Sequence, residues 1–248
     1  LVTGFYTSGT GDIINVMIIC SIGALVLLWL DGKFDSFNFV LIPVIGPLIG
    51  TLGLFILPYV KMISLYIGQA IMYFTQLQPY LMSVLICVTF AIMIVAPIST
   101  VAIGLAIGLN GLSAGAAAMG VGTTCIVLVV HSFFINKPGV TTAVALGSMK
   151  MMMANVFESP ISYLPIVSTS ILTGSLVPFF TITGTPASAG FGLVGLTGLF
   201  ASITGGLSVP TAILAWLIIP IAIAILFRIL WEKILKLYSA TIFKFAEE

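Results

Sequence analysis

The sequence predicts an all-α polytopic membrane protein with about 7–8 membrane segments, some of them broken or re-entrant. Hydrophobic residues make up 60% of the 248 residues and charged residues 6%, whereas a soluble domain carries about 25% charge. The apolar runs approach or exceed the ~20 residues that a helix needs to cross a bilayer, and they lack the period-2 alternation of a membrane barrel. We expect one membrane domain over residues 1–248: a polar lead-in at 1–12, membrane and re-entrant segments at 13–230, and an amphipathic tail at 231–248.

Mostly plain spans are expected in the first part of the chain. Residues 13–30 form the first, and residues 39–60 form the second, which three prolines interrupt. Residues 62–78 carry glutamines among apolar residues, which predicts either a helix lying in the interface or a short span facing protein. A clear span follows at 80–96. The chain begins with Leu1 and a stretch unlike a signal peptide, so we expect that earlier spans are missing.

Broken segments alternate with spans in the rest of the chain. Pro97 and a series of glycines make residues 97–115 too apolar for an aqueous loop and too broken for a plain helix. This composition predicts a re-entrant or discontinuous helix whose free backbone groups are covered by protein, and residues 184–206 share it. Spans are expected at 116–135, 161–182 and 210–230, a turn at 136–139, and a further segment at 140–157.

The two broken segments contain similar motifs. GLNGLSAG (108–115) and GLTGLFAS (195–202) each follow a Pro-x-Ser, at 97–99 and 186–188. Paired broken segments point to a transporter site built at a repeat interface. Chance similarity between glycine-rich membrane segments is the alternative.

Residues 148–165, SMKMMMANVFESPISYLP, place Lys150, Asn155 and Glu158 in an otherwise apolar run. A charge at membrane depth costs about 2.5–3.5 kcal/mol on insertion scales, so it persists where it lines a cavity, has a partner or has a function. A carboxylate accepts strong hydrogen bonds from hydroxyl groups, and an amide both donates and accepts. We therefore expect a solute-binding site here. The alternative is a cytoplasmic loop with solvated charges, which the three methionines disfavour.

The spacing in this stretch argues against a simple ion pair. On one continuous helix Lys150 and Glu158 would lie about 12 Å apart along the axis, too far for direct contact but suited to bracketing a polar ligand. The Ser159-Pro160 pair predicts that the helix does not continue past Glu158.

Four other polar residues complete the candidate site. Ser99 and Thr100 follow Pro97 in the first broken segment, and Ser188 lies in the second. His131 is the one histidine of the chain, and we expect it either at the interface or as a polar contact in the solute cavity.

Several function classes are excluded or unsupported. The three cysteines are widely spaced, which predicts neither a metal site nor a disulfide framework. GFGLVG (190–195) matches GxGxxG but lacks the preceding strand and following acidic residue of a nucleotide site, so we interpret it as close packing. No catalytic residues, metal or cofactor are expected, and a net charge of +1 suggests no nucleic-acid partner.

A resemblance to a known family rests on this stretch and on longer motifs. NVFESPI (155–161) followed by LPIV (164–167) resembles the N-x-x-E-P-[IV]…L-P-I-V stretch of sugar-specific enzyme IIC subunits. Those subunits are the membrane channels of the bacterial phosphoenolpyruvate-dependent phosphotransferase system. The resemblance implies that Glu158 and Asn155 contact sugar hydroxyls. Ser159 stands where the family's proline usually follows the glutamate directly, which leaves the local backbone open.

Nearly the whole chain resembles the enzyme-IIC-like family described as regulatory membrane proteins. The motifs are GTGDIINVMI (9–18), TQLQPYLMSVLI (75–86), APISTVAIGLAIGLNGLSAGAAAMG (96–120) and ALGSMKMMMANVF (145–157). This resemblance implies an elevator-type architecture, in which a substrate-carrying part moves against a dimerisation scaffold, and a homodimer. Phosphoryl transfer would then need separate IIA and IIB partners, so the chain would not be an enzyme by itself.

Three functions remain open from the sequence. The first is a permease subunit in the bacterial inner membrane that moves a sugar or similar small polar solute by alternating access. The second is a membrane-embedded sensor or regulator with the same fold and no turnover. The third is a carrier of a non-sugar or lipid-like solute, which the small number of polar residues in the candidate site suggests. The basic residues Arg228, Lys233, Lys236 and Lys244 predict a cytoplasmic C-terminus, and Trp231, Leu235 and Tyr238 suit an amphipathic helix on the membrane surface.

Overall fold

The computed structural model describes residues 13–30 and 38–245, and their regular elements are helices. Among the described residues, four helices are long and apolar enough to cross a membrane: Leu41–Phe74, Gly111–Ser132, Pro160–Phe179 and Val209–Ile234. Shorter apolar helices cover Asn15–Leu30, Pro79–Ile94 and Val194–Thr204. The expected all-α membrane protein is confirmed at this level, while the number of membrane segments stays a prediction.

The chain forms two compact units, residues 1–67 and 68–248. In the first unit, α2 (Ile13–Leu30) has the bounds expected from the sequence, and α3 (Asn38–Phe74) runs on past the division. Buried Asn15 on α2 donates a hydrogen bond to the carbonyl of Gly53 on α3 at 3.0 Å. This bond ties the two helices because an unpaired amide would be costly among apolar side chains. The polar lead-in expected at 1–12 lies outside the described residues.

α3 is longer than the sequence pattern suggested. Its 37 residues continue through residues 62–74, so the expectation of a separate interfacial or short segment at 62–78 is wrong. No proline stands between Val60 and Gln78, and the helix therefore meets no obstacle there. α3 ends at Phe74 and turns follow at 75–77. Gln78 (φ −56°, ψ 144°) is extended, because Pro79 forces the preceding residue out of the helical region.

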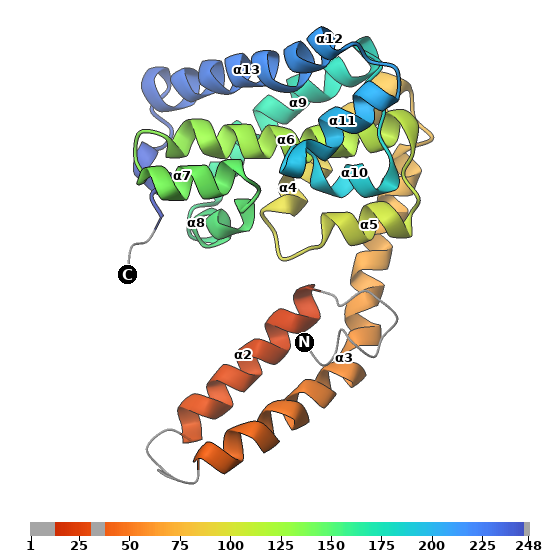
Figure 1. The fold of residues 1–248 in the computed structure, drawn as a ribbon. Coiled ribbons are helices and arrows are strands. Elements are labelled where there is room, and N and C mark those ends of the chain that lie inside the picture. Colours follow the sequence, from red (N-terminus) through yellow and green to blue (C-terminus); the bar gives the residue numbers. More distant parts are fainter. Residues whose placement is uncertain (1–12, 31–37, 246–248) are drawn as a thin grey trace. The chain divides into compact units, whose positions relative to one another are not determined.

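The second unit is built on α4 (Pro79–Ile94), α6 (Gly111–Ser132) and α9 (Tyr163–Phe179), which pack against one another (Figure 1). α6, drawn in green, is buried from Ala114 to Leu128. Its small residues allow close approach of neighbouring backbones: a Cβ added at Gly120 would meet the carbonyl of Cys87 on α4. Between α6 and α9, the buried hydroxyls of Thr123 and Thr173 bond each other at 2.8 Å.

Short helices fill the rest of this unit. The segment expected at 140–157 is not one helix but α7 (Pro138–Ala145), the 3₁₀-helix η2 (Met149–Met152) and α8 (Met153–Glu158). Gly147, with φ +119°, makes the break, since a positive φ is open to glycine. The broken segments expected at 97–115 and 184–206 contain α5 (Thr100–Ala106), and α10 (Pro186–Phe191), η4 (Val194–Leu196) and α11 (Thr197–Thr204). Their depth in a membrane stays a prediction.

The last span runs through α12 (Val209–Ile213), η5 (Leu214–Ile218), α13 (Ile219–Arg228) and η6 (Ile229–Ile234). η5 and η6 are π-helical, and the amide of Ile219 bonds the carbonyl of Leu214 five residues back. Pro220, which has no N–H and would clash in a regular helix, follows directly. The π-turn thus lets the span pass a proline without ending.

The tail does not form the expected amphipathic surface helix. η6 ends at Ile234, Lys236 has φ +51°, and the 3₁₀-helix η7 covers Ala240–Phe243. Tyr238, expected at the membrane surface, is buried in the second unit. The left-handed residue turns the chain back so that Tyr238 reaches His131.

We predict that Gly120→Ala destabilises the protein by about 1–3 kcal/mol or more, because the added methyl overpacks the contact between α6 and α4. Gly139→Ala is the matched control, since nothing lies within 4 Å of the corresponding Cβ. Thermal unfolding in detergent, followed by tryptophan fluorescence, measures both. Equal melting temperatures for the two variants would contradict the role given to the close approach.

Candidate functional site

The polar stretch forms two short helices and a break. η2 and α8 bury their apolar side, with Met149, Met152 and Val156 almost inaccessible. Ser159 (φ −131°, ψ 80°) leaves the helical region before Pro160 and ends α8 at Glu158, as the Ser-Pro pair predicts. The 3₁₀-helix η3 (Pro160–Ser162) then leads into α9. Glu158 therefore lies at the last position of α8.

Glu158 is exposed, and within the described residues it has no hydrogen-bond or ion-pair partner. The other described glutamate, Glu232, accepts a hydrogen bond from Nε of Arg228 at 2.9 Å. A carboxylate can only accept, so an unpartnered one is available to the hydroxyl or N–H donors of a ligand. In this respect Glu158 differs from Lys150 and Asn155, whose side chains bond backbone carbonyls.

Lys150 points to a different part of the unit. Its ammonium donates to the carbonyls of Ala96 at 2.6 Å and Ile98 at 3.0 Å, just beyond the C-terminal end of α4. A cation is favoured there because the free carbonyls of a helix end carry partial negative charge. Burial lowers the pKa of Lys150 from its ordinary 10.5. The contact joins the polar stretch to the loop before α5.

Ser99, Thr100 and Ser188 lie where α5 meets α10. Ser99 caps α5, its Oγ accepting from the amide of Ala102 at 3.2 Å. Thr100 donates to the carbonyl of Gly190 at 2.9 Å and so bonds α5 to α10. Ser188 and Thr185 bond reciprocally as a capping box at the start of α10. A Cβ added at Gly190 would meet the backbone of Val101, so the two short helices are in direct contact.

Asn155 and His131 instead hold the C-terminal tail, residues 235–245, in place through hydrogen bonds that we call the clamp. Asn155 donates from Nδ2 to the carbonyls of Ile242 and Lys244, at 3.1 and 2.7 Å. His131 is fully buried; Nδ1 bonds the Val127 carbonyl at 2.8 Å and Nε2 bonds the Tyr238 hydroxyl at 2.9 Å. Because a carbonyl only accepts, Nδ1 carries the proton, and Nε2 of the neutral ring accepts from Tyr238.

The clamp has partners that sequence reasoning missed. Burial and, second, the charge of Glu232 raise the pKa of Tyr238 above its ordinary 10.0, which keeps its hydroxyl a donor. Asn136 donates to the Phe243 carbonyl at 2.8 Å and accepts from the Phe245 amide at 2.7 Å. Phe243 and Phe245 lie 107 and 109 residues after Asn136 in the sequence, so no local sequence pattern predicts these contacts.

The structure thus divides the seven predicted residues. Lys150, Ser99 and Thr100 lie at or bond the loop at 95–100, and Thr100 bonds α10, whose start Ser188 and Thr185 cap. Asn155 and His131 hold the tail, and Glu158 shares α8 with Asn155. Their assignment to a solute stays a prediction. The described residues contain no cluster of three or more His, Cys, Asp or Glu side chains that could hold a metal.

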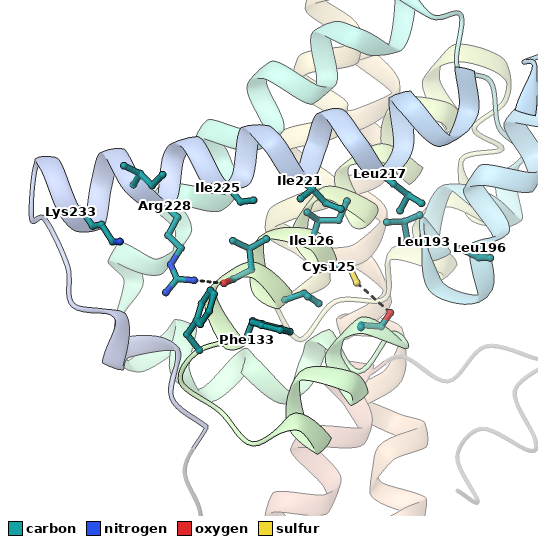
Figure 2. A pocket seen from close by; sticks show the side chains of 15 residues that line it. Cys125, Ile126, Phe133, Leu193, Leu196, Leu217, Ile221, Ile225, Arg228 and Lys233 are labelled. Carbon is teal, nitrogen blue, oxygen red and sulfur yellow. Dashed lines mark hydrogen bonds between the residues drawn. The ribbon is translucent and has the colours of Figure 1, made fainter. Parts of the chain in front are cut away.

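A cavity of about 770 Å³ lies elsewhere, between α6 and α13 (Figure 2). Its lining is apolar apart from Arg228 and Lys233, and none of the seven predicted residues lines it. A sugar needs several convergent polar partners, which this cavity does not offer.

Comparison with protein families gives one match. The family described as phosphotransferase system, EIIC, matches residues 1–245. The searches of curated proteins and of solved structures found no significant match.

We predict that Asn155→Ala loosens the tail without unfolding the protein, because two hydrogen bonds from its amide to tail carbonyls are lost. Hydrogen–deuterium exchange over residues 239–245 should become at least about fivefold faster, given about 0.5–1.5 kcal/mol per hydrogen bond. Asn110→Ala is the control, since the Asn110 amide bonds only the nearby Gly108 carbonyl. Unchanged exchange in Asn155→Ala would contradict the clamp.

Proposed function

The chain belongs to the phosphotransferase system EIIC family, and we propose that it is a permease subunit that binds and translocates a sugar or similar small polar solute by alternating access. In this system the EIIC component is the membrane permease and not the phosphoryl-transferring unit. Separate IIA and IIB proteins would supply phosphoryl transfer. We place the protein in the bacterial inner membrane, with a cytoplasmic C-terminus on the basis of its basic tail.

The observation that carries this proposal is Glu158. It is a carboxylate without a partner among the described residues, and it ends a short helix inside the stretch that resembles the family's sugar-contact motif, with Ser159 in place of its proline. Sugar hydroxyls are donors, and a charged acceptor forms hydrogen bonds with them that are stronger than neutral ones. Glu158 is therefore proposed as the principal solute contact.

The remaining candidate residues differ in how many hydrogen-bond donors and acceptors they still have available for a solute. Lys150 uses two of its three N–H donors, and the Ser99 hydroxyl can still donate. Asn155 keeps its carbonyl oxygen free of the tail bonds. Ser188 and His131 have their polar atoms bonded within the protein, so support for them as direct contacts is weaker.

The architecture we propose is of the elevator type. Two separately compact units, residues 1–67 and 68–248, are what a scaffold and a solute-carrying part require. The second unit holds all seven candidate residues and the paired short helices α5 and α10. Short broken helices in contact are the arrangement from which many transporters build their solute sites. A homodimer formed through the scaffold completes the proposal.

We predict that Glu158→Gln weakens solute binding about 10- to 100-fold, since a hydrogen bond to a charged group contributes about 1.5–3 kcal/mol. The measurement is scintillation proximity with a panel of radiolabelled hexoses, pentoses and hexitols on purified protein. Glu232→Gln is the control, because its carboxylate pairs with Arg228 and should not affect binding.

Counterflow of the bound solute in proteoliposomes then separates the two functions without needing phosphotransfer partners. Exchange of labelled solute supports the permease. Binding without exchange assigns the chain to the alternative, a membrane-embedded sensor or regulator. Equal affinity of the wild type and Glu158→Gln for every solute that binds removes Glu158 from the site.

A further inference from the structure

The cavity between α6 and α13 has an apolar wall and a basic end. Ile221 and Ile225 of α13 line it together with Leu193, Leu196 and the part of α6 around Cys125 (Figure 2). Its volume, about 770 Å³, falls in the range of about 300–1,000 Å³ that small-molecule sites occupy. The apolar side chains of the wall are suited to contact with a hydrocarbon chain.

Two cations lie at one end of this cavity. Arg228 donates from Nη1 to the carbonyl of Val130 at 2.6 Å and from Nε to Glu232 at 2.9 Å. Its guanidinium lies 5.1 Å from the centroid of the Phe134 ring, within reach of a cation–π interaction. These contacts fix the guanidinium in place, and within the described residues its Nη2 group makes no hydrogen bond.

Lys233 adds a second, more accessible charge. It lines the cavity and is exposed, and within the described residues it has no hydrogen-bond or ion-pair partner. With Arg228 positive and Glu232 negative, Lys233 leaves this end of the cavity with one net positive charge. An anion is therefore favoured there over a neutral group.

The two cations lie near the ends of two candidate spans. The spans Gly111–Ser132 and Val209–Ile234 both end beside the basic end of the cavity. Arg228 and Lys233 fall in the last turns of one span, and Val130 and Phe133 at the end of the other. Long basic side chains at span ends reach the headgroup region of a bilayer, whereas Ile221 and Ile225 lie nearer the middle of their span.

We propose that this cavity binds an anionic phospholipid of the surrounding bilayer. One acyl chain lies along the apolar wall, and the phosphate lies between Arg228 and Lys233. Basic pockets between membrane helices are known to hold anionic lipid headgroups. The inference does not rest on the sugar-permease proposal, because none of the seven candidate solute residues lines the cavity.

The test is native mass spectrometry of the full chain after exchange into equimolar phosphatidylglycerol and phosphatidylcholine with identical acyl chains. The wild type should retain phosphatidylglycerol in preference. Lys233→Gln should lower the ratio of the two bound lipids by about fivefold, the factor that one basic side chain contributes near an anionic surface. Lys236→Gln, which removes an exposed charge outside the cavity, should leave the ratio unchanged.

A second pair of variants tests the apolar part. Ala145 lines the cavity, whereas Ala222 is exposed on α13 outside it. Ala145→Trp should fill the space and lower retention of both lipids, and Ala222→Trp should not. Circular dichroism melting confirms that each variant is folded.

Three results would overturn the proposal: equal retention of both lipids by the wild type, equal effects of Lys233→Gln and Lys236→Gln, or displacement of the lipid by a sugar from the panel. The last would assign the cavity to the solute. Glu158→Gln should keep the wild-type lipid ratio, so failure of the lipid site and failure of the solute site are distinguishable.

Discussion

Unpaired backbone carbonyls at the ends of broken helices are the constraint on which the second unit depends. In a membrane protein such groups find no water, and each must be satisfied inside the fold. Lys150 bonds the carbonyls after α4, Thr100 bonds α10, Arg228 bonds the end of α6, and Asn155 bonds the tail. Donor side chains that a polar pattern suggests for a ligand are thus largely used on the protein's own backbone.

This constraint explains why Glu158 differs from its neighbours. A carboxylate has no donor and cannot satisfy a carbonyl, and within the described residues Glu158 accepts no hydrogen bond from a backbone N–H. Backbone pairing therefore gives no reason for its presence. Lysine, threonine and asparagine can serve the fold and a solute alike, and their presence in an apolar run does not distinguish the two roles. The acceptor-only residue is therefore more informative about ligand binding than the donors around it.

The sequence predicted features whose causes are local. The bounds of α2, the break after Glu158 and the interrupted segments around α5 and α10 follow from apolar run length, proline and glycine. Sequence patterns did not predict the contacts between residues that lie far apart in the chain. The Lys150 contacts span 52 and 54 residues and the His131–Tyr238 bond spans 107. The cavity likewise joins α6 to α13, and its basic end depends on where two spans finish together.

The position of Glu158 depends on the tail more than on its own helix. α8 has six residues, and an isolated helix of that length is not stable in itself. The helix is held in place by the burial of Met152 and Val156 and by the two hydrogen bonds from Asn155 to the carbonyls of Ile242 and Lys244. The tail is in turn held at the end of α6, through Tyr238 on His131 and through Asn136. Asn155 therefore acts on Glu158 by positioning the helix that carries both.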